Sequence, residues 1–210
     1  MGVPDTRNRW NLYLSCEMKK LILFLFLITP ALAESSLEFE YGAERYTQAP
    51  SIKGPSAVNE HFAITPSTTF HDFQFGLDYE INRDTTKGSP LQSMLEAQIS
   101  HDLFTIGQFT TSLQVGLGRI INQVGGDYSH YQFTLEEDYK VNKSLTLTSN
   151  YRYRNAFDNI QTKYYFESNT GKIGFAYEIV KNVELGVRYT TKFGAQQHAH
   201  GMEGGFVVSF

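Results

Sequence analysis

Residues 72–81 read DFQFGLDYEI and decide the fold, because apolar and polar residues alternate through the whole stretch. The odd positions are all apolar: Phe73, Phe75, Leu77, Tyr79 and Ile81. Successive side chains of a strand point to opposite faces of the sheet, so the stretch predicts a β-strand with one apolar and one polar face. A tilted strand of about ten residues is long enough to cross the hydrocarbon layer of a membrane.

The same alternation recurs in eight further segments, which begin near Leu37, Leu91, Thr111, Tyr131, Leu145, Ile173, Val183 and Phe206. Strands of a soluble sandwich average five or six residues, whereas these are longer and carry tyrosines at their ends. Single-chain bacterial barrels have an even number of strands, so we place a weak tenth strand near residues 58–65. The sequence therefore predicts an all-β fold, a closed antiparallel up-and-down transmembrane barrel of ten strands, with eight or twelve as alternatives.

The expected strands cover residues 36–46, 58–65, 70–82, 90–101, 108–121, 129–140, 144–155, 164–179, 182–193 and 204–210. Two connections are very short, KVNKS after Tyr139 and VKNVE after Ile179. The others are longer and richer in Gly, Pro, Asn and His: residues 47–57, 83–90, 122–130, 155–163 and 194–204. Short turns of such barrels face the periplasm and long loops face outward.

Composition excludes several other classes of protein. The 210 residues are 41% hydrophobic and 14% aromatic with a net charge of -4, which excludes a basic nucleic-acid binder. A mean hydropathy of -0.32 with one long apolar run excludes a polytopic helical membrane protein. The many aromatic residues and glycines suit strands.

The N-terminus has the three parts of a secretory signal peptide. Met18-Lys19-Lys20 precedes the apolar run LILFLFLIT, and Ala31-Leu32-Ala33 is a small-residue cleavage site. We therefore assign residues 18–33 to the signal, 34–210 to the barrel and 1–17 to an upstream mis-start of translation. The mature chain then has fourteen bases, twenty acids and no cysteine, because Cys16 is removed. Export to the outer membrane of a Gram-negative cell fits this composition.

The signal, the alternating strands and the terminal FVVSF together resemble a bacterial outer-membrane β-barrel protein. The resemblance implies that Phe206, Val208 and Phe210 form the signal read by the barrel-assembly machinery, and that lipid and lipopolysaccharide surround the barrel. SLTLTSNYRYRN and ELGVRYTTKFG also show a faint similarity to the arginine-bearing strands of the oligogalacturonate-specific porin family, which takes up acidic oligosaccharides. That family is normally twelve-stranded, and about 177 mature residues are too few for twelve strands.

The inward phase of the strands places charged residues in the lumen. Acids lie early and bases late: Glu40, Asp78, Glu80 and Glu96, then Arg152, Arg154, Arg188 and Lys192. The third and eighth strands of a ten-stranded barrel are diametrically opposite, so we expect an acidic wall to face a basic wall. With strands about 4.8 Å apart and tilted about 45°, the backbone radius is roughly 11 Å. The charges then either pair as a dry plug or lie apart with water between them.

This lumen predicts a narrow porin-like channel for small hydrophilic or anionic solutes, with the arginines selecting anions. A closed structural or adhesive barrel without conductance is the alternative, and an enzyme with a site at the outer rim is a weaker one. His198, His200 and Glu203 are the residues from which a rim site could be built. The other four histidines are expected at interfaces or in loops. The sequence predicts no catalytic residue, no cofactor, no metal site and no nucleic-acid partner.

We predict that the mature protein begins at Glu34, since only there do the apolar run, the cleavage site and the first strand follow in order. N-terminal sequencing of protein extracted from membranes tests this. Recovery of any residue before Met18 would contradict the assigned start.

Overall fold

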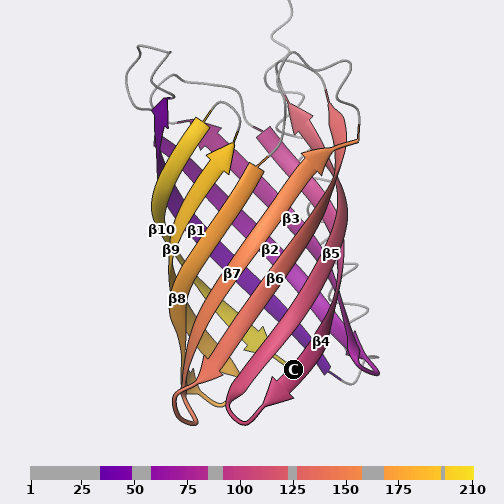
Figure 1. Cartoon of the computed structure of the whole chain (residues 1–210), viewed down its shortest axis with the longest axis vertical. Helices are drawn as coiled ribbons and strands as arrows, with labels where there is room; N and C mark the ends of the chain where they lie inside the picture. The colour runs from indigo at the N-terminus through magenta and orange to yellow at the C-terminus, as the bar shows by residue number, and fades with distance from the viewer. Residues whose placement is uncertain (1–33, 49–57, 85–91, 123–126, 158–167, 195–196) are drawn as a thin grey trace, which may run out of the picture. The chain divides into compact units, whose positions relative to one another are not determined.

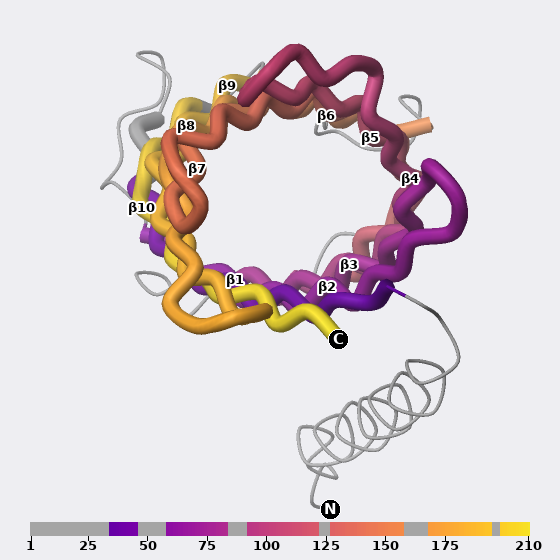
Figure 2. Tube along the Cα trace, turned by 90° about the horizontal axis from the view of Figure 1, so that it is seen from below, coloured from indigo at the N-terminus to yellow at the C-terminus, as the bar shows by residue number. Residues whose placement is uncertain are grey.

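The computed structural model describes residues 34–48, 58–84, 92–122, 127–157, 168–194 and 197–210, and these ranges hold ten strands. The strands are β1 (Glu34–Gln48), β2 (Val58–Phe70), β3 (Phe73–Asp84), β4 (Gln92–Ile106), β5 (Phe109–Asn122), β6 (Tyr128–Lys140), β7 (Leu145–Ala156), β8 (Ser168–Val180), β9 (Val183–Gly194) and β10 (Gln197–Ser209). Each strand pairs antiparallel with its neighbours in sequence, and β1 pairs with β10 to close the barrel (Figures 1 and 2). The predicted ten-stranded closed barrel is confirmed.

The segments assigned to the mis-start and the signal peptide, residues 1–33, lie outside the described residues, so both assignments stay predictions. Among the residues that are described, no helix has the length and apolar character of a membrane span.

Three strand boundaries lie five or more residues from those expected. β4 runs to Ile106 instead of residue 101. β2 runs to Phe70 instead of residue 65, and the register with β3 is the same before and after Pro66, where two ladder pairs are missing. β10 begins at Gln197, so the predicted loop over 194–204 is wrong from that residue onward. Glycines and histidines hide the apolar period of this segment, while β1 and β9 supply its backbone partners.

Four short connections lie at one end of the barrel, which we call the turn end; the opposite end is the loop end (Figure 1). Three of these connections are two-residue turns that contain a left-handed residue: His71 at φ 56°, Gly107 at 64° and Asn182 at 70°. Positive φ lets a tight turn follow the twist of its strands. The turn end is the one that barrels of this class direct to the periplasm.

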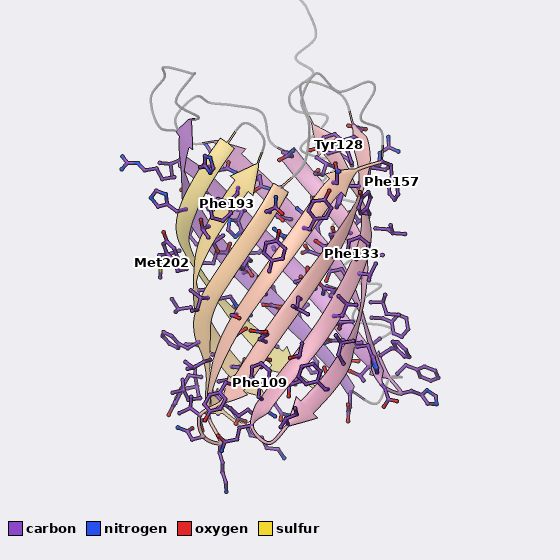
Figure 3. All side chains as sticks on the ribbon, viewed as in Figure 1. Phe109, Tyr128, Phe133, Phe157, Phe193 and Met202 are labelled. Atoms are coloured by element: carbon purple, nitrogen blue, oxygen red, sulfur yellow. The ribbon has the colours of Figure 1, made fainter. Side chains whose placement is uncertain are left out.

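The outer wall of the barrel is apolar on every strand. Leu117 is 57% exposed, Ile173 64% and Phe133 47%, and their neighbours in the same phase are similar. Figure 3 shows Phe133 and Met202 projecting away from the wall. A soluble monomer rarely exposes apolar patches larger than a few hundred Å², so this surface faces lipid.

Charged residues in the outward phase lie near the ends of strands. Arg119 pairs with Asp127 at 3.3 Å near the loop end. Glu137 accepts a hydrogen bond from Ser149 at 3.4 Å and lies three residues before the end of β6. The pairing of β6 with its neighbours has no bulge, so closeness to the turn-end interface accounts for this acid.

The C-terminal strand carries the expected apolar face. Phe206 stacks on Phe39 of β1 with ring centroids 4.7 Å apart, across the seam that closes the barrel. Phe210 is exposed at the turn end. A role of Phe206, Val208 and Phe210 in assembly stays a prediction.

Phe133→Arg should destabilise the barrel by about 2–4 kcal/mol, because Phe133 lies at the middle of β6 and the charge would sit near the bilayer midplane. Phe157→Arg is the matched control, since Phe157 is an exposed aromatic just beyond the loop end of β7 and should cost only about 0–1 kcal/mol. Urea unfolding in lipid vesicles measures both. Equal costs would show that the outer wall is not embedded in lipid.

Candidate lumenal site

The lumen is polar, and all eight charged residues assigned to it project inward. Glu40, Asp78, Glu80, Arg152, Arg188 and Lys192 line one cavity, and Glu96 and Arg154 form an ion pair between β4 and β7. These strands are not neighbours, so the contact crosses the interior. Whether the residues control selectivity is taken up under the proposed function.

A first cluster, which we call the loop-side cluster, surrounds the fully buried Glu96. His130 Nε2 lies 2.7 Å from Glu96 Oε2, and Arg154 Nη2 donates to the same oxygen at 3.4 Å. Gln98 donates to the other oxygen at 2.8 Å. Three partners therefore satisfy a carboxylate that has no access to solvent.

Gly118 makes room for the histidine of this cluster. It pairs with His130 across β5 and β6, and a Cβ at Gly118 would lie 2.6 Å from the Cε1 atom of the imidazole. The ring therefore lies flat against the inner wall, where a side chain from β5 would otherwise stand.

A second cluster, the central cluster, contains Glu40, His61, Lys172, Arg188 and Glu203. His61 Nε2 lies 3.2 Å from Glu40 Oε1 and 3.5 Å from Glu203 Oε1. Lys172 Nζ donates to Glu40 Oε1 at 3.0 Å and lies 2.5 Å from Glu203 Oε2. Arg188 donates to the remaining oxygen of Glu40 at 3.3 Å. Two cations and an imidazole thus hold two carboxylates.

Other inward charges lie outside these two clusters. Lys192 donates to the buried Glu44 at 2.7 Å. Asp78 accepts a hydrogen bond from Thr65 at 3.0 Å, and Glu80 accepts one from Asn82 at 2.6 Å. In the part of the chain that the structure describes, Arg152 has no carboxylate within ion-pair distance and points into the cavity.

Among the described residues, two of the spaces within the lumen are large enough for several water molecules. A cavity of about 140 Å³ is lined by the central cluster, Asp78, Glu80 and Arg152. A vestibule of about 590 Å³ lies at the turn end, between His71, His101, Asp102, Glu136 and Asp138. Gln114 and Glu136 line both spaces, so the cavity and the vestibule adjoin.

The expected arrangement of two opposed walls is only partly right. Arg152 and Arg154 of β7 interact with Asp78, Glu80 and Glu96, as expected, but the bases of β9 form their ion pairs with other acids. Arg188 and Lys192 of β9 contact acids of β1, which is only two strands away, and Arg154 of β7 contacts Glu96, three strands away. These ion pairs therefore join strands that are two or three positions apart in the barrel wall. They form because the strands tilt and bring residues of different strands to the same height in the lumen.

The histidines also differ from expectation. His61 and His130 are buried in the lumen beside carboxylates, whereas they were expected at interfaces or in loops. Both occupy the inward phase of their strands, and this signal was available in the sequence. His198 and His200 are exposed, while Glu203 is buried inside, so the three residues do not form the rim site that the sequence suggested.

Comparisons with known proteins identify the fold. No protein-family model matches the chain, and no curated protein sequence matches it. Among solved structures, the COG4313 outer membrane channel from Pseudomonas putida F1 aligns with a TM-score of 0.60 at 6% identity, over 85% of this chain and 96% of that one. Neisserial surface protein A aligns with a TM-score of 0.43 at 16% identity, over 85% of this chain and 99% of that one. The KdgM porin aligns with a TM-score of 0.42 at 13% identity, over 83% of this chain and 99% of that one. The fold is that of the outer-membrane β-barrel proteins.

Arg154→Met should destabilise the barrel by about 3–5 kcal/mol, because it leaves Glu96 buried with less charge compensation. Arg119→Met is the matched control: it breaks an Arg–Asp pair of similar length at the surface and should cost about 1 kcal/mol or less. Adding Glu96→Gln to Arg154→Met should recover part of the loss. Urea unfolding of wild type, Arg154→Met, Glu96→Gln and the double variant gives the coupling energy, and a coupling near zero would show that the pair is not formed.

Proposed function

We propose that the protein is a narrow channel for small hydrophilic solutes in the outer membrane of a Gram-negative bacterium. The observation that carries the proposal is the charged lumenal cavity of about 140 Å³, which adjoins the vestibule at the turn end. A polar, water-filled interior is what porin channels have. The Pseudomonas putida protein, which is an outer membrane channel, adds support because its structure shares the fold.

The loop-side half of the lumen sets the size limit of the channel. Met94, Glu96, His130 and Gln132 are among the largest fully buried side chains of the described residues, and they lie on the loop-end halves of β4 and β6. Solutes pass this layer only when its side chains move apart. The conductance should therefore be low, and the permeating solutes no larger than hydrated ions and very small polar molecules.

Selectivity follows from the charges that line the cavity. Arg152 is a guanidinium directed at the cavity without an ion-pair partner among the described residues, and it can contact an anion. Asp78 and Glu80 line the same space and oppose it. Because both signs are present, the preference for anions should be modest, and Arg152 should account for it.

Met94→Ala should raise the single-channel conductance in planar bilayers, because it removes a buried side chain from the narrow layer and leaves every charge in place. Met202→Ala is the control: Met202 is 53% exposed on the outer wall (Figure 3), and its loss should leave the conductance unchanged. In the same bilayers, Arg152→Ser should shift the reversal potential in a salt gradient toward cations.

A closed structural barrel is the second candidate, and the buried loop-side layer favours it. Absence of current from wild type, Met94→Ala and Arg152→Ser, each with the heat-modifiable gel migration of a folded barrel, would establish it and refute the channel.

A further inference from the structure

We propose that the lumen contains a binding site for a divalent transition-metal ion such as Zn²⁺, formed by Glu40, His61 and Glu203 of the central cluster. The three residues come from β1, β2 and β10, which are neighbours in the barrel wall. One nitrogen and two carboxylate oxygens lie within 4.8 Å of one another. Imidazole and carboxylate are ligands that Zn²⁺ accepts together in proteins.

The distances between the donor atoms fit a metal between them. His61 Nε2 is 3.2 Å from Glu40 Oε1 and 3.5 Å from Glu203 Oε1. Ligands at about 2.0–2.2 Å from a tetrahedral Zn²⁺ are about 3.3–3.6 Å apart. The site thus needs only small side-chain adjustments, and its fourth position would face the cavity of about 140 Å³, where water or a solute can bind.

The strand register holds the three ligands together. Gly42 of β1 pairs with His61 on one side and with Glu203 on the other, and Glu40 is the next inward residue of β1. A Cβ at Gly42 would overlap the imidazole ring and lie 2.7 Å from Cγ of Glu203. The glycine therefore leaves the space in which the imidazole and the carboxylate of its two neighbours converge.

The composition of the cavity lining gives an independent reason to expect a bound cation. Its lining contains six carboxylates and four basic side chains, all from described residues, which leaves two carboxylates in excess. The ammonium of Lys172 already contacts both Glu40 and Glu203, so a cation occupies this position in the metal-free protein. A metal ion would compete with Lys172, whose side chain also lines the cavity and has room to turn away.

This site does not depend on conduction, and metal binding tests it directly. Untagged barrel in detergent is titrated with Zn²⁺ by calorimetry and with Co²⁺ by visible absorption. We expect one equivalent of metal to bind, and the intense bands of four-coordinate Co²⁺. Lys172→Met should tighten binding by about tenfold or more, because it removes the competing charge. His61→Asn and Glu203→Gln should each weaken it by about tenfold or more.

Two controls separate this site from other histidines. His130→Asn alters a buried lumenal histidine that lies beside a single carboxylate, and the double variant His198→Asn/His200→Asn removes the exposed pair. Both should bind as wild type does. Loss of binding in the double variant, or unchanged binding in His61→Asn and Glu203→Gln, would overturn the proposal. Absence of Co²⁺ bands from both wild type and Lys172→Met would also overturn it, whether or not the other variants fold.

Discussion

The rest of the structure depends on one constraint: in hydrocarbon, every backbone N–H and C=O must be paired within the protein. A sheet meets this only when it closes, and β1 and β10 close this one through thirteen paired positions. Closure then gives every strand one face toward lipid and one toward the lumen. Whether a residue contacts lipid or the lumen is therefore set by its place in the alternation along the strand. Polar residues that cannot lie in lipid are forced inward, into a space too narrow for bulk water to solvate them all. The ion pairs of the lumen are a consequence of this confinement.

Confinement also explains how the charges pair. Tilted strands bring inward residues of β1, β2, β8 and β9 to one level, and Glu40 thereby meets Lys172, Arg188 and His61 at once. Such clusters are costly to assemble from hydrated ions, and they persist only when most of their atoms have partners. Glycines of the inward phase contribute because they have no side chain: Gly42 and Gly118 leave room for the two buried imidazoles. Paired charged side chains thus fill much of the lumen. The cavity lies where carboxyl groups outnumber basic side chains.

The alternation of inward and outward residues is also the feature that the sequence could predict. The alternation from Phe73 to Ile81 recurs in the other strands. Together these segments predicted the fold class, the closing strand and the inward direction of all eight lumenal charges. The alternation failed where β10 begins, because Gly201, Gly204 and Gly205 carry no side chain to mark a face. It could not supply the pairing of charges, since that depends on how far each strand is shifted against the next, and a local pattern contains no such information. His61 and His130 differ from expectation for another reason: histidine is common at interfaces, and the inward phase of these two residues is the one signal in the sequence that places them in the lumen.

The two lumenal histidines have different surroundings, and the difference bears on what each cluster can do. His130 lies in a layer where Glu96 is held by an arginine, a glutamine and the imidazole itself, so both oxygens of this carboxylate are already engaged. His61 lies between two carboxylates and opens onto a cavity lined by more carboxyl groups than basic side chains. A neutral imidazole there can act as a ligand, and a protonated one can take the place of a missing cation. The loop-side cluster is therefore suited to closing the lumen, whereas the central cluster is suited to exchanging one cation for another.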